Sequence, residues 1–549
     1  MGDKQNIGLA LSGGGFRAAF FHIGVLASLA DVGVLKNVKV LSTVSGGTII
    51  GVLYYLKLKS KIKDLETKST GDEINQFYRD IIEEVKGEFY EFVKLNIRTM
   101  SFLNPLKNSK IFLSELLKVD DYTRSKHIGE LIEKHLYKKY RVDAKKPLLM
   151  SDLHSVENGL PKLIINTTNY NSGGSWLFET DKMRQLQSNA RSTKNISFST
   201  INYKKGEKEV CLSDAVAASA CVPGLFRPIK LRGMFNSGLN LNLIDGGIFD
   251  NQGIESLLPE NCTHFIVSDG SKQLNNQYRV KSTLEIFGRT NDMLMSRVRE
   301  QQINNLLDRF GQEKVAFIHL LYGTNGVKWT EDEGSMFLEQ KTDNIEKEVI
   351  PNNHLNLLSK IRTDLDSFTE IEAYSLMYSG FKISNTEIED RFGLESTNNI
   401  NFAKNAEGFF GKSVVDEKFK DHIEISQKRF LKWYYHILLK IKKYPKVNKK
   451  ESTLDRFRNR IFNFICKPKN LIIPSLITLY LIFGLDTFIS LFGLHTSPSI
   501  HISFVKLLWL LAVTIIFLPV VLIVISTLVF ISLNTLDKLF LHLGKIKNN

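Results

Sequence analysis

Residues 7–29 read IGLALSGGGFRAAFFHIGVLASL, and this stretch decides the fold class. Ile7–Ser12 is a short apolar run that predicts a buried strand, and Arg17–Leu29 is apolar on nearly all sides, which predicts a buried helix. The glycines at 13–15 lie between them. Residues without a Cβ atom let backbone N–H groups converge, and a helix start adds partial positive charge. The stretch therefore predicts an α/β fold with an anion-binding turn after its first strand.

Several functions use a glycine turn of this kind. Gly13, Gly15 and Ala18 match the GxGxxA dinucleotide pattern, but the next predicted strand, Val38–Thr43, does not end in the acid that this pattern expects. A Walker phosphate loop needs Gly-Lys-Ser/Thr, which is absent from the turn. The remaining interpretations are an oxyanion hole, whose amides stabilise an acyl-transfer intermediate, and a purely structural turn.

A second motif centres on Ser45. Val38–Val44 predicts a strand, Thr48–Leu56 predicts a helix, and Ser45-Gly46-Gly47 joins them. A serine at a sharp strand-to-helix turn is the nucleophile elbow of α/β hydrolases. The local string TVSGG has Thr43 where GxSxG has its first glycine, so the motif alone is weak. Its position within the same β-α-β-α unit as the glycine turn strengthens it.

A serine nucleophile needs a base. None of the 12 histidines lies in a recognisable catalytic motif, and His22, inside the apolar first helix, is predicted to be a core residue. Asp245 is a better candidate, because it ends the apolar run Leu241–Ile244 and precedes Gly246 and Gly247. Glycines beside a carboxylate allow another loop to approach closely. An ordinary Asp-Gly turn is the alternative interpretation.

Taken in order, these motifs resemble the patatin-like phospholipases. The resembling segments are Gly13–Arg17 (GGGFR), Ser45–Gly47, Ala217–Ala220 with Pro223–Pro228, Asp245–Gly247, and Ile361–Phe368, which is similar to a C-terminal element of bacterial members. The resemblance covers residues 5–385. It implies a three-layer α/β/α hydrolase domain that cleaves acyl esters of membrane phospholipids.

The resemblance also implies a Ser–Asp dyad without histidine. Ser45 would be the nucleophile and Asp245 the general base, and no cofactor or metal would be required. The backbone amides of Gly13, Gly14 and Gly15 would stabilise the oxyanion. The alternative is a catalytically silent membrane scaffold or binding protein on the same fold.

Three further residues would support this site. Arg17 would brace the glycine loop or meet a substrate phosphate, and Gly46 and Gly47 would make room for the elbow. Thr43, where the family usually has glycine, puts the packing of the elbow in doubt.

The net charge of +14 is concentrated in one stripe. Residues 427–470 hold 14 Lys and Arg against two acids, whereas residues 1–426 are neutral overall. A nucleic-acid binder more often carries its charge on a folded face, so no nucleic-acid partner is predicted. Beside apolar segments, the cations of residues 428–469 predict contact with an anionic membrane surface.

Two apolar segments near the C-terminus predict transmembrane helices. Leu507–Leu533 has 27 consecutive uncharged residues. As a helix it would run about 40 Å, longer than the ~30 Å hydrocarbon core. Leu471–Leu494 contains Asp486, which either lies near an interface or is protonated, or else bonds a polar group on the second helix or a partner. Lys and Arg flank the outer ends of both spans, which predicts a cytoplasmic catalytic domain. The hairpin also offers a contact for oligomerisation.

The predicted organisation is a hydrolase domain over residues 1–390 and a basic helical tether over residues 391–470, followed by spans at 471–494 and 507–533. Within the first part, Glu73–Lys118 predicts a helical insertion near the active-site mouth, and Gln185–Asn195 predicts a loop. The four cysteines show no CxxC or zinc spacing, which favours a reducing compartment.

Overall fold

The computed structural model describes residues 5–103, 111, 122–154, 159–187, 197–202, 209–233, 240–271, 283–321, 350, 352–397, 537–538 and 541–542. The chain divides into two compact units, Met1–Phe430 with Val529–Asn549, and Leu431–Leu528. All of the described residues belong to the first unit. Within them no helix is both long and apolar enough for a membrane span. Both predicted spans, Asp486 and residues 398–470 of the predicted tether lie outside the described residues.

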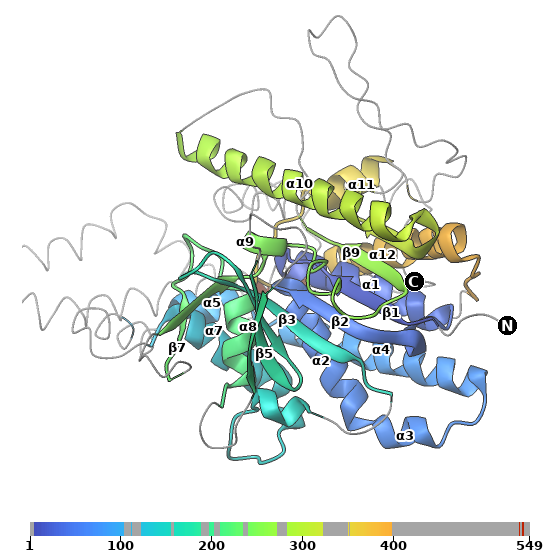
Figure 1. Ribbon diagram of the computed structural model, residues 1–549, viewed down its shortest axis with the longest axis horizontal. Coiled ribbons are helices and arrows are strands. Elements are labelled where there is room, and N and C mark those ends of the chain that lie inside the picture. The colour runs from blue at the N-terminus through green and yellow to red at the C-terminus, as the bar shows by residue number, and fades with distance from the viewer. Residues whose placement is uncertain are drawn as a thin grey trace, which may run out of the picture. The chain divides into compact units, whose positions relative to one another are not determined.

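A ten-stranded mixed sheet forms the middle layer (Figure 1). Its order is β10-β9-β1-β2-β3-β4-β5-β6, and β8 pairs with both β3 and β7. The strands are β1 (Ile7–Leu11), β2 (Val38–Val44), β3 (Lys162–Asn169), β4 (Ser175–Glu179), β5 (Lys182–Gln187), β6 (Ser197–Asn202), β7 (Ile229–Leu231), β8 (Leu241–Asp245), β9 (His264–Asp269) and β10 (Val315–His319). The strands from β10 to β3 are parallel, whereas β4 to β8 join by antiparallel pairing.

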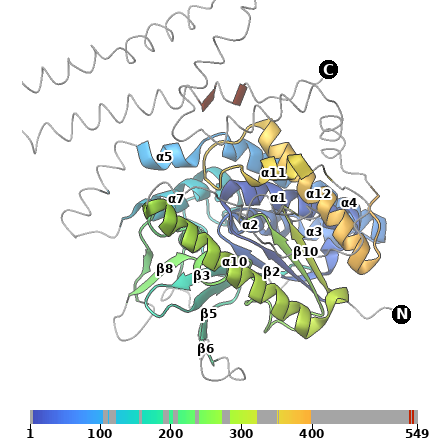
Figure 2. The same cartoon turned by 90° about the horizontal axis from the view of Figure 1, so that it is seen from above.

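Helices cover both faces of this sheet (Figures 1 and 2). They are α1 (Gly15–Asp31), α2 (Gly46–Ser60), α3 (Ile62–Glu66), α4 (Gly71–Val93), α5 (Ile97–Leu103), α7 (Arg124–Ile132), α8 (Leu212–Ser219), α9 (Gly247–Asp250), α10 (Thr283–Phe310), α11 (Asn352–Ser359) and α12 (Glu370–Phe392). Neighbouring residues of β1 enter different cores, Leu9 and Leu11 on the side of α1 and Ala10 on the side of α10. This alternation is what a strand buried on both faces requires. The predicted three-layer α/β/α class is confirmed.

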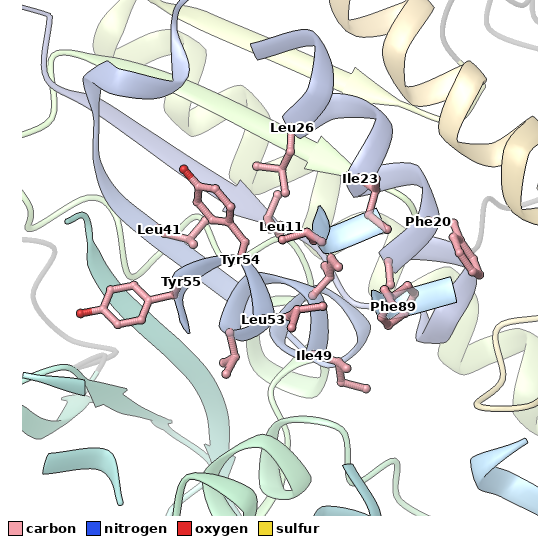
Figure 3. Close-up of a cluster of buried hydrophobic side chains, with 14 of the residues drawn as sticks. Leu11, Phe20, Ile23, Leu26, Leu41, Ile49, Leu53, Tyr54, Tyr55 and Phe89 are labelled. Atoms are coloured by element: carbon pink, nitrogen blue, oxygen red, sulfur yellow. The ribbon is translucent and has the colours of Figure 1, made fainter. Parts of the chain in front are cut away.

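The larger core lies between the sheet and helices α1, α2, α4 and α12. Figure 3 shows part of it, with Leu11 and Leu41 from the strands beside Ile23, Leu53 and Phe89 from the helices. The Phe89 ring of α4 packs edge to face on Phe20 of α1, with ring centroids 5.1 Å apart. Aromatic pairs of this geometry are favourable beyond the area that they bury.

The position of α4 corrects one prediction. The segment Glu73–Lys118 was predicted to be a helical insertion near the active-site mouth, but its first part, in α4, is a core helix that contacts α1 and α2, while residues 104–110 and 112–118 lie outside the described residues. It begins with a capping box in which Thr70 accepts from the Glu73 amide, and Glu73 accepts from the Thr70 amide. Helix α1 is apolar on nearly all sides and needs cover on its outer side, which α4 and α12 supply. The predicted Gln185–Asn195 loop is also too long, since β5 continues to Gln187.

Candidate active site

Ser45 occupies a strained turn between β2 and α2. Its φ of 49° and ψ of −115° lie outside the regions that residues with side chains usually adopt. A Cβ atom on Gly46 would lie 2.1 Å from the Gly15 carbonyl oxygen, and one on Gly47 would lie 2.3 Å from that of Leu11. Both glycines are therefore required by the close approach of the β1–α1 turn. The predicted elbow geometry is present.

Thr43, the departure from the family pattern, is accommodated by a glycine on α2. A Cβ atom on Gly51 would lie 2.5 Å from Cγ2 of Thr43, so the threonine methyl uses space that a larger residue would fill. The Thr43 hydroxyl donates to the Ile164 carbonyl at 3.0 Å and accepts from the Thr48 hydroxyl at 3.2 Å. The threonine is therefore both packed and hydrogen-bonded beneath the elbow.

Asp245 reaches Ser45 through strand pairing. Strand β8 ends at Asp245 and runs antiparallel to β3, which places Asp245 opposite Thr167. The carboxylate lines the same pocket as Ser45, near enough for the serine side chain to lower its pKa, and its Oδ1 accepts the Gly247 amide at 2.7 Å. Burial raises the pKa of Asp245 to about 7, although the hydrogen bonds from Gly247 and Ser45 lower it. A carboxylate with this pKa can accept a proton near neutral pH.

The glycine turn lies beside this pair, but its three amides are not equivalent. The Gly13 amide donates to the Asn251 carbonyl at 2.9 Å, so it is already engaged. Gly14 and Gly15 have φ values of 140° and 59°, and their amides meet no acceptor within the described residues. Of the three predicted oxyanion donors, the structure therefore leaves Gly14 and Gly15 and assigns the Gly13 amide to loop packing.

All of these groups line one pocket of about 240 Å³. The lining comprises the glycine turn, Ser45, Asp245, residues 222–223, residues of the α9 segment, five residues of α10 and Thr363. Ser45 and Asp245 are 7% and 6% exposed, so the pair sits at the base of the pocket and largely out of water. Low water content strengthens hydrogen bonds to a developing charge.

Arg17 braces the glycine turn from behind. Its side chain is 1% exposed and donates to the carbonyls of Gly270 at 3.2 and 3.3 Å, Ser359 at 2.8 Å and Ile361 at 2.9 Å. Burial lowers the pKa of Arg17 to about 10, and the charge of Asp269 opposes that effect. Arg17 does not line the pocket. Of its two predicted roles, bracing fits the structure and contact with a substrate phosphate does not.

Ser219 joins the nucleophile turn to the base turn, and the sequence interpretation assigned it no role. Its hydroxyl accepts the Ser45 amide at 2.9 Å and donates to the Asn166 carbonyl at 2.7 Å. Its own carbonyl accepts the Gly246 amide at 3.3 Å. One buried residue at the end of α8 thus holds both turns, the Ser45 turn through its hydroxyl and the Asp245 turn through its backbone carbonyl. The signal in the sequence was a serine among small residues in the segment that resembles the family.

His22 is a core residue, as predicted. It is fully buried, with Nδ1 2.7 Å from the Ser268 hydroxyl and Nε2 2.9 Å from the Ser12 carbonyl oxygen. Burial lowers the pKa of His22 to about 4, against the opposing effects of the Ser12 hydrogen bond and the Asp269 charge. The imidazole is therefore neutral, both of its nitrogens are hydrogen-bonded, and it does not line the pocket.

The fold and the turn at Ser45 place the chain among α/β proteins. Comparison with known proteins narrows the protein family of one part of the chain. Residues 9–258 match the family model described as "Patatin-like phospholipase", and this part of the chain is a patatin-like phospholipase domain. No curated protein matches the chain.

Two solved structures align with the chain. Human GIVD cytosolic phospholipase A2 aligns at 11% identity and a TM-score of 0.35, covering 73% of this chain and 62% of that one. VipD from Legionella pneumophila aligns at 12% identity and a TM-score of 0.27, covering 82% of each chain. The chain thus spans less than two thirds of the length of the human protein.

Proposed function

We propose that the chain is a membrane-anchored serine lipid acyl hydrolase of the phospholipase A type, which cleaves acyl esters of membrane lipids. The observation that carries the proposal is that Ser45 and Asp245 line one pocket together with the glycine turn, whose Gly14 and Gly15 amides have no acceptor within the described residues. A nucleophile, a base and oxyanion donors at one pocket are what acyl transfer needs. The patatin-like phospholipase domain supports a lipid as the substrate.

In the first half of the reaction, Asp245 takes the proton of Ser45 as Oγ attacks the ester carbonyl carbon. The tetrahedral oxyanion accepts hydrogen bonds from the amides of Gly14 and Gly15. In other acyl hydrolases the loss of one such donor costs about 10²–10³ in rate. The intermediate then collapses, the ester C–O bond breaks, and Asp245 returns the proton to the departing alcohol oxygen. The acyl group remains on Ser45.

Water completes the second half. A water molecule gives a proton to Asp245 while its oxygen attacks the acyl carbonyl, and the same amides stabilise the second oxyanion. Collapse breaks the bond to Oγ, the proton passes from Asp245 to Ser45, and the fatty acid leaves. A base with a pKa near 7 serves both directions of proton transfer at neutral pH.

The direct test compares two buried serines. Ser45→Ala removes the proposed nucleophile, whereas Ser384→Ala changes a fully buried α12 serine whose hydroxyl has no hydrogen-bond partner within the described residues. With the full chain and phospholipid vesicles, we expect Ser45→Ala to lower fatty-acid release by about 10³-fold or more and Ser384→Ala to leave it unchanged. Circular dichroism checks that both variants are folded. Wild-type release from Ser45→Ala would refute the proposed function.

A fluorophosphonate probe separates this proposal from the silent scaffold. Acyl-transfer chemistry predicts covalent labelling at Ser45, because the probe reacts only with an activated serine. Labelling should disappear in Ser45→Ala and slow strongly in Asp245→Asn. A folded wild-type chain that takes up no label would support the scaffold.

We propose further that the segments at 471–494 and 507–533 anchor the chain and that the catalytic domain faces the cytoplasm. The support is the 27-residue uncharged run and the Lys and Arg that flank both segments. Extraction of membranes with alkaline carbonate should leave the full chain in the pellet. A variant lacking 471–533 that also pellets would contradict this anchor.

A further inference from the structure

Exposed apolar side chains gather around the mouth of the pocket. Val222 and Ile248 line the pocket and are 41% and 45% exposed, and Leu225, close behind Val222 in the chain, is 66% exposed. Single exposed apolar residues are ordinary on protein surfaces, whereas a group of them beside a pocket marks an interaction site.

Helix α10 lines the pocket and also exposes several large apolar side chains. The residues of α10 that line the pocket are Asn291, Asp292, Met295, Ser296 and Arg299. Its exposed large apolar residues are Ile286, Met293, Leu294 and Val298, which are 49%, 48%, 61% and 40% exposed. At about 3.6 residues per turn, Ile286, Met293 and Leu294 lie away from the pocket-lining side of the helix, while Val298 lies beside it. Polar residues such as Thr290, Arg297 and Gln301 are exposed among them, so α10 presents large apolar side chains within a mixed surface beside the pocket.

The three segments form one region. Figure 1 shows α10 lying over α9, and the two helices are in contact. Cations accompany the apolar residues. Arg297, whose side chain is 82% exposed and pairs with Glu300 at 3.3 Å, lies between Leu294 and Val298, while Arg227 and Lys230 are exposed just beyond Leu225. Apolar side chains with interspersed Lys and Arg are typical of surfaces that meet anionic lipid, because the long stems let the charged ends reach phosphates.

We propose that the apolar rim, namely Val222, Leu225, Ile248, Ile286, Met293, Leu294 and Val298, enters the headgroup layer of an anionic phospholipid bilayer, so that the pocket opens directly onto lipid. This inference deepens the proposed function and rests on it, since it names the surface through which a lipid leaves the bilayer for Ser45. The acyl chain would pass between α9 and α10 without crossing water.

The first test measures insertion without activity. In a background with Cys211 and Cys466 replaced by serine, Leu294→Cys is labelled with an environment-sensitive fluorophore, because the remaining Cys221 and Cys262 are buried. Val142→Cys is the matched control, since Val142 is 79% exposed and does not line the pocket. In phosphatidylglycerol vesicles that contain brominated acyl chains, the label at 294 should be quenched and the label at 142 should not. Equal quenching, or none at 294, would overturn the proposal.

The second test compares two substrates. Leu225→Asp with Leu294→Asp alters the rim, and Val142→Asp with Tyr170→Asp makes the same change at residues that are 79% and 66% exposed elsewhere. We expect the rim variant to lose about tenfold per position in vesicle hydrolysis, since each leucine gives up part of its burial in lipid. Its hydrolysis of a monomeric butyrate ester should stay at the wild-type rate, and the control variant should keep both activities.

The two failures are distinguishable. A rim variant that hydrolyses vesicles at the wild-type rate would overturn the rim proposal while leaving the hydrolase intact. A wild-type chain that hydrolyses neither substrate would refute the proposed function, and the quenching measurement would still decide whether the rim enters lipid.

Discussion

Lowering the pH below 7 should switch the proposed hydrolase off by protonating Asp245. The residue is 6% exposed, and burial raises its pKa from the ordinary 3.8 to about 7. A general base must be ionised, so activity is present above this pKa and is lost as the pH falls through it. Each pH unit below the pKa lowers the ionised fraction about tenfold, which leaves roughly 1% of the activity at pH 5. With an ordinary pKa, activity would be flat from pH 5 to 8.

The assay is kcat/KM of the full chain for a monomeric butyrate ester between pH 5 and 8.5, with released acid quantified by chromatography. This parameter reports ionisations of the free enzyme. Burial lowers the pKa values of His22 and His319 to about 4, so neither imidazole produces an inflection near 7. Burial also raises the pKa of Asp250 to about 7, and Asp250→Asn should keep the inflection because Asp250 does not line the pocket. A flat wild-type profile would refute the reasoning.

The same carboxylate should lower stability where it raises activity. Because the folded-state pKa of Asp245 lies above its unfolded value, the folded protein binds the proton more tightly. Stability is therefore lost as the pH rises from about 4 to 7, by roughly 4 kcal/mol at most. Asp245→Asn should be inactive yet melt at a higher temperature than wild type at pH 8, with the difference shrinking at pH 5. A variant that is less stable than wild type at pH 8 would contradict this account.

Three further substitutions test the supporting structure. Ser219→Ala removes the acceptor of the Ser45 amide, so kcat should fall about tenfold with KM unchanged, while Ser384→Ala leaves both unchanged. Arg17→Met strips donors from three buried carbonyls at about 1–3 kcal/mol each, so thermal unfolding should shift far down, whereas a phosphate-binding role would instead raise KM in a stable variant. Gly51→Ala should destabilise the fold through its contact with Thr43, and adding Thr43→Gly should recover part of the melting temperature; additive losses would show that the two residues do not share that space.

Local structure around the candidate site could be predicted because the sequence patterns that indicate it lie within a few neighbouring residues. The strand, glycine turn and helix of residues 7–29 form β1 and α1, and Ser45 lies at the turn that its neighbours indicated. The role of His22 as a core residue was also predicted from its neighbours, because an imidazole in a helix that is apolar on nearly all sides is most simply explained as a hydrogen-bonded core residue.

What could not be predicted depends on contacts between distant segments. The engagement of the Gly13 amide depends on Asn251, which is far away in the chain. Similarly, α4 has the sequence pattern of an amphipathic helix that could belong to an insertion. It is part of the core because it packs against the apolar outer side of α1, a contact that its own sequence does not indicate. The register that brings β8 beside β3 has no local signature, so Asp245 was proposed as the base from its neighbouring residues and from family resemblance, and not from topology.

Thr43 illustrates why a departure from a motif is a poor guide to the loss of a site. A family pattern records the usual solution to a packing problem, here a glycine beneath the elbow, but not the problem itself. What the elbow requires is that β2 and α2 approach closely, and one missing side chain on either side meets that requirement. In this chain the missing side chain is at Gly51 on α2, and the threonine gains two hydrogen bonds in return. The packing therefore survives the substitution, because the position without a side chain is Gly51 on α2 and not residue 43 on β2. The motif around the serine does not include Gly51.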